Sequence, residues 1–205
     1  MNYKPEAVAA VPVFNSLLCF VDERLDKQHR PDSELVDKHN ADPKNADWKI
    51  EPDAPFEQAD VVHDFLAFLA ERMIALNEQR QKQLKAFLQW LEAELEIAPD
   101  AKGREGIEAL TGKTRLKDFL GDYQKGEETF ALEELWEILR KNKRRIGRSL
   151  TPTFMQEVRT SYEHGLSNLL PIKETLRLTD GLIDQIVYRL YGLTEEAMDL
   201  VEGQQ

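Results

Sequence analysis

The fold is decided by residues 57–96, EQADVVHDFLAFLAERMIALNEQRQKQLKAFLQWLEAELE. Apolar residues recur there three or four apart, as one face of a helix requires, and neither Gly nor Pro interrupts the run. At about 1.5 Å per residue, such a helix is roughly 55–60 Å long. The apolar stripe comprises Val62, Phe65, Leu69, Met73, Leu76, Leu84, Phe87, Leu91 and Leu95, with Arg80 at its one polar step. The stretch therefore predicts one long helix.

Upstream of this helix, residues 1–55 are predicted to form an N-terminal helix and a loop rich in Pro and Asp. Apolar residues spaced three to four apart between Val13 and Leu25 indicate the helix, and Pro12 suits its first turn. Cys19 falls within that apolar set, which predicts a buried thiol. Four prolines between residues 29 and 55 then break the helical pattern and predict a long loop.

Downstream, residues 56–205 are predicted to form a helical module around the long helix. The turn signals Pro99, Gly103 and Gly112 separate short pieces, and Thr151-Pro152 is a capped helix start. Pro171 is expected to kink or end the helix that begins there. The expected helices span residues 105–110, 115–120, 131–145, 151–170, 180–191 and 195–201, the fifth capped by Asp180 and stopped by Gly192, and the last capped by Thr194.

Together these segments predict an all-α protein, an elongated helical bundle built on one long helix (about 57–96) with several shorter helices and no sheet. The chain has 27 basic and 38 acidic residues, hence a net charge of -11, which argues against a surface that is basic throughout. No apolar run reaches the roughly 20 residues of a membrane span, and no secretory signal is visible. We therefore expect a cytoplasmic protein without a membrane partner.

Motifs for catalysis, cofactors or metals are weak in this sequence. Gly112-Lys113-Thr114 resembles the end of a phosphate-binding P-loop, but Ile107 stands where that motif needs Gly, and a helix-breaking turn explains it better. The four histidines and the single Cys19 lack zinc-ligand spacing. We therefore predict no catalytic, cofactor-binding or metal-ligating residue, and the sequence offers no positive evidence that this chain alone is an enzyme.

One run of cations is distinct in this acidic chain. It holds six basic residues with no acid among them: Arg140, Lys141, Lys143, Arg144, Arg145 and Arg148. Cations at a helix C-terminus complement its dipole, but six exceed that need. Clustered Arg and Lys also supply the sequence-independent part of nucleic-acid affinity. These six residues are our candidate contact with the DNA backbone.

Several stretches, taken in order, resemble a known family. The clearest is LIDQIVYRLYGLTEE at residues 182–196, followed by Val201-Glu202-Gly203. The earlier stretches are residues 62–77, 87–92, 110–114 and 169–171. In this order they resemble the helical C-terminal region of type IIG restriction-modification enzymes and of related phage-defence adenine-specific DNA methylases. The resemblance covers about residues 60–203.

That family's methyltransferase uses an Asn-Pro-Pro-aromatic motif and a glycine-rich loop for S-adenosylmethionine, and neither occurs in this chain. The resemblance therefore implies a non-catalytic helical module of a restriction-modification or phage-defence methyltransferase system. Its expected partners are the methylase or endonuclease part, in the same chain or another, and the DNA backbone. Two alternatives remain open: a scaffold that binds only protein through its long helix, and an acidic DNA mimic that inhibits a restriction enzyme.

Overall fold

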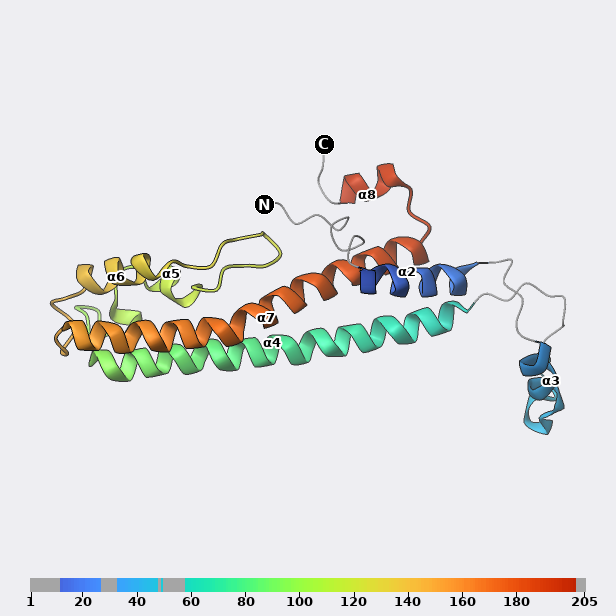
Figure 1. Ribbon diagram of the computed structural model, residues 1–205, viewed down its shortest axis with the longest axis horizontal. Helices are drawn as coiled ribbons and strands as arrows, with labels where there is room; N and C mark the ends of the chain where they lie inside the picture. The colour runs from blue at the N-terminus through green and yellow to red at the C-terminus, as the bar shows by residue number, and fades with distance from the viewer. Residues whose placement is uncertain (1–11, 27–32, 48, 50–57, 202–205) are drawn as a thin grey trace. The chain divides into compact units, whose positions relative to one another are not determined.

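A computed structural model describes residues 12–26, 33–47, 49 and 58–201, and most of these residues are helical (Figure 1). The described part contains no strand, only an isolated bridge between Ile97 and Ile146, and no helix in it is long and apolar enough to cross a bilayer. The all-α prediction is confirmed. The helices are α2 (Pro12–Leu25), α3 (Ser33–Ala41), α4 (Ala59–Leu95), α5 (Lys113–Lys117), α6 (Leu132–Lys141), α7 (Pro152–Leu190) and α8 (Glu195–Val201), with 3-10 turns η1 (Pro43–Asn45) and η2 (Gly106–Ala109).

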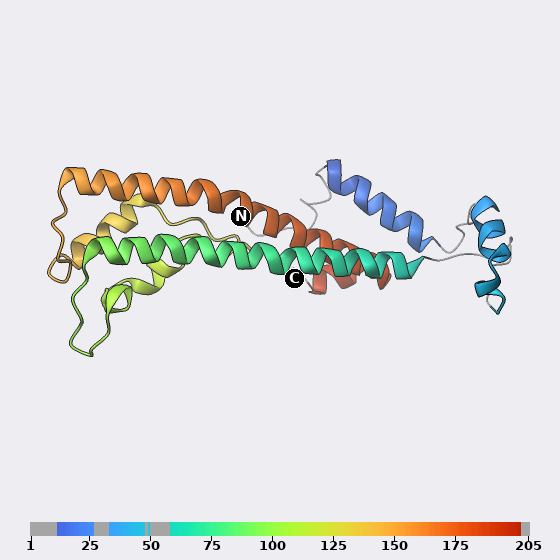
Figure 2. The same cartoon turned by 90° about the horizontal axis from the view of Figure 1, so that it is seen from below.

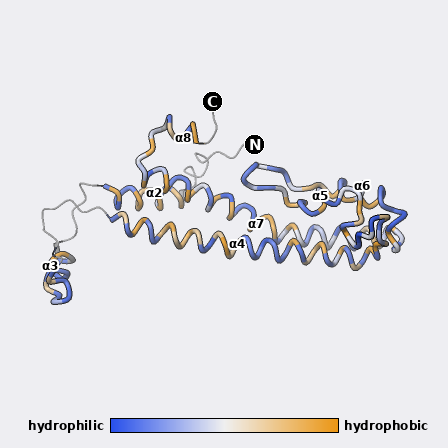
Figure 3. Tube along the Cα trace, turned by 180° about the vertical axis from the view of Figure 1, so that it is seen from behind, coloured by the Kyte–Doolittle hydropathy of each residue, from blue (hydrophilic) through white to orange (hydrophobic). Residues whose placement is uncertain are grey.

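Helix α4 confirms the predicted long helix to within two residues at each end. It has 37 residues, about 55 Å at the usual helical rise. Orange and blue alternate along α4 and α7 in Figure 3, as expected of helices with one apolar face. The buried members of the α4 stripe are Val62, Leu69, Leu76, Phe87, Leu91 and Leu95.

The chain divides into two compact units that share α4 and α7. Unit 1 comprises residues 72–179, and unit 2 comprises the described residues before 72 and after 179. Within unit 1, α4 and α7 lie side by side (Figures 1 and 2). The rings of Phe87, Phe119 and Tyr162 meet in its core, with centroids 5.1–5.6 Å apart. Aromatic burial of this kind contributes strongly to stability, so it fixes the segment between the two long helices against them.

Within unit 2, α2 packs on the first turns of α4. The rings of Phe20 and Phe65 lie 6.4 Å apart in an edge-to-face arrangement, and Arg189 of α7 donates to Asp22 at 2.9 Å. The predicted loop at 29–55 is wrong in part, because α3 and η1 occupy residues 33–45, and Asp42 caps η1 by accepting from the Lys44 N–H. The rest of that loop lies mostly outside the described residues. The division at residue 55 stays a prediction.

Helix α7 corrects two predicted boundaries. It runs through Pro171 without ending, and Asp180 lies inside it and begins no new helix. Pro171 is exposed, so the Ser167 carbonyl that loses its helical donor lies on the side facing water. Buried Leu169, Ile172 and Leu176 hold the opposite face in the core. Packing of one apolar face thus outweighs the local cost of the proline.

The C-terminal capping signals are confirmed. Gly192 adopts φ 61° after α7, in the left-handed region that favours Gly, and the Leu193 N–H returns to the Tyr188 carbonyl at 2.9 Å. The Thr194 hydroxyl accepts from the Ala197 N–H at the start of α8.

The prediction for Cys19 is wrong: the thiol is exposed, because buried Leu18 and Val21 face the other side of α2.

Candidate nucleic-acid interface

The candidate cations lie at the end of α6 and in the loop that follows it. Arg140 and Lys141 are the last residues of α6, which ends at Lys141 and is therefore shorter than predicted. The inner face of α6 buries Leu135, Trp136, Ile138 and Leu139, so its C-terminus is held firmly on the core of unit 1. Asn142 forms the C-cap and is only 3% exposed. Its side chain donates to the Ile138 carbonyl at 2.8 Å, satisfying a carbonyl at the helix end.

The loop after α6 is fastened to the end of α4. The Ala98 N–H donates to the Arg145 carbonyl at 2.8 Å, and the Gly147 N–H donates to the Leu95 carbonyl at 3.1 Å. A Cβ on Gly147 would lie 3.0 Å from the Glu96 carbonyl oxygen, so a larger residue would push the two segments apart. The backbone that carries the cations is therefore anchored on both sides.

Four of the six predicted cations have no ion pair within the described residues. We call Arg140, Lys143, Arg144 and Arg145 the basic tetrad. The first three side chains are exposed and Arg145 is half-buried. Salt bridges in the described part of the chain involve none of them. The tetrad therefore presents about four uncompensated positive charges to solvent at one end of unit 1.

The other two predicted cations, Arg148 and Lys141, form ion pairs with carboxylates. Arg148 bridges Glu94 and Glu157, the latter at 2.9 Å, and its guanidinium carbon lies 4.1 Å from the centroid of the Phe154 ring. Lys141 pairs with Glu137, one helical turn earlier, at 3.4 Å. The charge of Arg148 is thus neutralised by two carboxylates. Arg148 joins α4 to α7, and the predicted phosphate contact rests on the tetrad.

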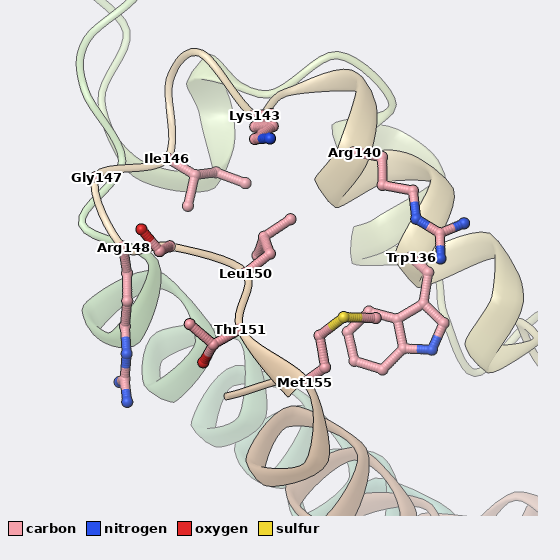
Figure 4. Close-up of a pocket in the computed structure, with 10 residues that line it drawn as sticks. Trp136, Arg140, Lys143, Ile146, Gly147, Arg148, Leu150, Thr151 and Met155 are labelled. Atoms are coloured by element: carbon pink, nitrogen blue, oxygen red, sulfur yellow. The ribbon is translucent and has the colours of Figure 1, made fainter. Parts of the chain in front are cut away.

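A pocket of about 430 Å³ opens beside the tetrad (Figure 4). Arg140 and Lys143 lie on its rim, Trp136 and Met155 form an apolar wall, and Thr151 stands at the start of α7. The Thr151 hydroxyl accepts from the Phe154 N–H at 3.2 Å, which caps that helix. The positive end of the α7 dipole adds to the field of the cations.

The chemistry of this pocket suits anion binding. Its lining holds three basic residues and neither a carboxylate nor a histidine, so it has no evident general base or metal ligand. Guanidinium and ammonium groups bind phosphate oxygens through charge-assisted hydrogen bonds. The sequence reveals the cations and the inward face of α6 that carries Trp136, but neither the hydrogen bonds of Asn142 nor the position of Trp136 on the pocket wall, because a lone Asn or Trp in a helical pattern carries no local signal of what it will contact.

The turn predicted at Gly112-Lys113-Thr114 is confined to Thr111-Gly112, because α5 begins at Lys113. Gly112 has φ 90° and precedes α5, while Lys113 pairs with Glu108 at 2.5 Å, so its ammonium is already engaged. No group of three His, Cys, Asp or Glu residues in the described part of the chain could hold a metal ion.

Comparisons of the whole chain with protein-family models, with curated proteins and with solved structures gave no match. The fold and the side chains themselves therefore carry the functional argument.

Proposed function

We propose that this chain is a non-catalytic helical module that contacts the DNA backbone through the basic tetrad. The observation that carries the proposal is that Arg140, Lys143, Arg144 and Arg145 have no ion pair among the described residues, in a chain of net charge -11. Elsewhere the chain commonly sets its cations against carboxylates, as at Arg115–Glu134 and Arg177–Glu174. Four cations without ion pairs, on the last turn of α6 and the anchored loop after it, are suited to an external polyanion.

The system in which the module works belongs to the same proposal. The ordered stretches between residues 60 and 203 resemble the C-terminal region of restriction-modification and phage-defence adenine methylases, so the partner is a methylase or endonuclease part in the same or another chain. Phosphate contacts position a protein on DNA but read no sequence. The module would therefore support target recognition performed by its partner. A role beside such an enzyme makes the protein cytoplasmic.

The test measures duplex DNA binding against salt concentration. The logarithm of the association constant falls with the logarithm of salt by about 0.9 for each phosphate contacted, so four cations predict a slope of about -3 to -4. Charge reversal at Lys143, Arg144 and Arg145 should make that slope shallower, with a magnitude of about 1 or smaller. A matched control reverses Arg72, Lys82 and Lys85, which are exposed on α4 and change the net charge equally.

The control should retain most of the wild-type salt slope. Equal weakening by both triple variants would mean that only net charge matters and would overturn the interface. Absence of duplex binding in the wild type, together with stoichiometric co-purification with a methylase, would favour the protein-only scaffold. One observation supports that second candidate: α4 exposes the large apolar residues Phe68 (60%) and Ile74 (62%).

A further inference from the structure

A second pocket, of about 520 Å³, lies in unit 1 away from the tetrad. Its walls come from α4, the end of α5 and the loop that follows α5. The loop is held in place by Lys173 of α7, whose ammonium donates to the carbonyls of Leu120 at 2.6 Å and Glu127 at 2.7 Å. The pocket is therefore built on fixed backbone, and its volume falls in the range of small-molecule sites, about 300–1,000 Å³.

Arg80 lines this pocket from the otherwise apolar face of α4. It occupies the one polar step of the apolar stripe on α4, between Leu76 and Leu84, and is half-buried. Its Nε–H is shielded from solvent and has no hydrogen-bond partner. The guanidinium lies 5.8 Å from the centroid of the Tyr123 ring but forms no ion pair within the described residues. An inward-facing cation without a carboxylate is costly unless an anion joins it.

Asp118 is the matching unpaired anion on the wall of the same pocket. The other charged groups there are engaged: Lys117 with Glu108, and Lys125 with Asp122 at 3.5 Å. The Glu127 carboxylate accepts from the Asp122 N–H at 3.1 Å. In the described part of the chain, the Asp118 carboxylate has neither an ion pair nor a hydrogen bond, and it does not pair with Arg80. One open cation and one open anion thus line a single pocket.

We propose that this pocket binds a small zwitterion that carries a carboxylate and an ammonium group, as a free amino acid does. The carboxylate would lie on the Arg80 guanidinium, whose planar fork matches two carboxylate oxygens. The ammonium group would lie on Asp118. The lining carries as many carboxylates (Asp118, Asp122 and Glu127) as basic side chains (Arg80, Lys117 and Lys125), so the pocket has no net positive charge to favour a phosphate dianion. The proposal is independent of DNA contact, because the two pockets share no lining residue.

The test titrates the full chain with each of the common amino acids by calorimetry, and separately with acetate, methylammonium and inorganic phosphate. At least one amino acid should bind saturably below about 10 mM, and at least tenfold more tightly than acetate or methylammonium. Arg80→Met should weaken this binding at least tenfold, and Asp118→Asn several-fold. Arg72→Met, a matched control two turns earlier on α4, should leave it unchanged.

Arg80→Met should fold, because it replaces an unpaired charge with an apolar side chain in an apolar stripe, and its Tm should equal or exceed that of the wild type. Arg80→Lys keeps the charge, loses the fork and should bind several-fold more weakly, which tests the geometry separately. The proposal is overturned if no amino acid binds, if acetate or phosphate binds as tightly as the amino acid, or if Asp118→Asn binds like the wild type.

Discussion

The side-chain amide of Asn142 exchanges two hydrogen bonds with the backbone of Thr111. The Thr111 N–H donates to Oδ1 at 2.9 Å, and Nδ2 donates to the Thr111 carbonyl at 2.9 Å. Nδ2 also donates to the Ile138 carbonyl inside α6. The exchange ties the end of α6 to a turn thirty-one residues earlier. Because the basic tetrad flanks Asn142, this buried amide fixes the backbone that displays the tetrad.

Asn142→Ala should destabilise the protein by about 1–3 kcal/mol, because it removes the two part-buried hydrogen bonds to the Thr111 backbone and the buried one to the Ile138 carbonyl. Asn142→Asp should cost at least as much, since a carboxylate oxygen would then face the carbonyls of Thr111 and Ile138. Urea unfolding measures both. Asn168→Ala is the control: Asn168 is exposed and should change stability by less than about 0.5 kcal/mol. Equal effects at both sites would contradict this role for Asn142.

Arg148→Met should distinguish the ion-paired cation Arg148 from the basic tetrad, which has no ion pairs among the described residues. Met keeps an apolar contact with Phe154 but loses the bridge between Glu94 and Glu157. Because the Arg148 side chain is 37% exposed, the loss should be about 1 kcal/mol or less. The salt slope of DNA binding should stay unchanged, whereas Arg144→Met, with the same change of charge, should reduce it by about 0.9. A reduced slope for Arg148→Met would place Arg148 on the DNA.

Much of the fold could be predicted because its signals are local. The α4 stripe and the capping residues Gly192 and Thr194 act through neighbours three or four residues away, so periodicity and residue type reveal them. The course of α7 could not be predicted, because it is decided by the burial of Leu169 and Ile172 in a tertiary core, while Pro171 and Asp180 locally favour an end and a new start.

The candidate site also has some features that the local sequence reveals and others that only tertiary contacts decide. The run of six cations is visible in the sequence, but its separation into a paired and an unpaired set is not. Glu94 lies 54 residues before Arg148, and only the fastening of the loop to α4 brings the two together. The surroundings of Arg80 are equally non-local, since the Tyr123 ring near its guanidinium is carried by a loop that Lys173 holds, and Asp118 lines the same pocket from the end of α5.

Pro171→Ala should stabilise the protein by about 1–3 kcal/mol, because Ala supplies the N–H that the Ser167 carbonyl lacks and removes the clash of the ring with that carbonyl. Calorimetric unfolding should show the higher Tm. Pro152→Ala is the matched control: Pro152 is the first residue of α7, where the N–H has no helical partner, so little change is expected. A lower Tm for Pro171→Ala would mean that the packing of α7 requires the shape that Pro171 gives it.

The stability of the protein in acid should depend on Asp100, which follows the end of α4 and accepts several hydrogen bonds. Its carboxylate accepts from the N–H groups of Lys102 and Arg104, each at 2.9 Å, and from the Arg104 side chain at 2.6 Å. The Arg104 side chain is the main cause that lowers the pKa of Asp100 from 3.8 to about 2, with the backbone bonds adding to it and desolvation opposing it.

Because the folded pKa lies below the unfolded one, the stabilising effect of Asp100 is complete above about pH 4 and is lost as the pH falls to about 2. Asp100→Asn should therefore be less stable than the wild type at neutral pH, and the two free energies of unfolding should converge as the pH approaches 2. Arg104→Gln removes the main cause of the shift and should flatten the wild-type slope in the same window. Parallel curves for the wild type and Asp100→Asn from pH 5 to pH 2 would contradict the lowered pKa.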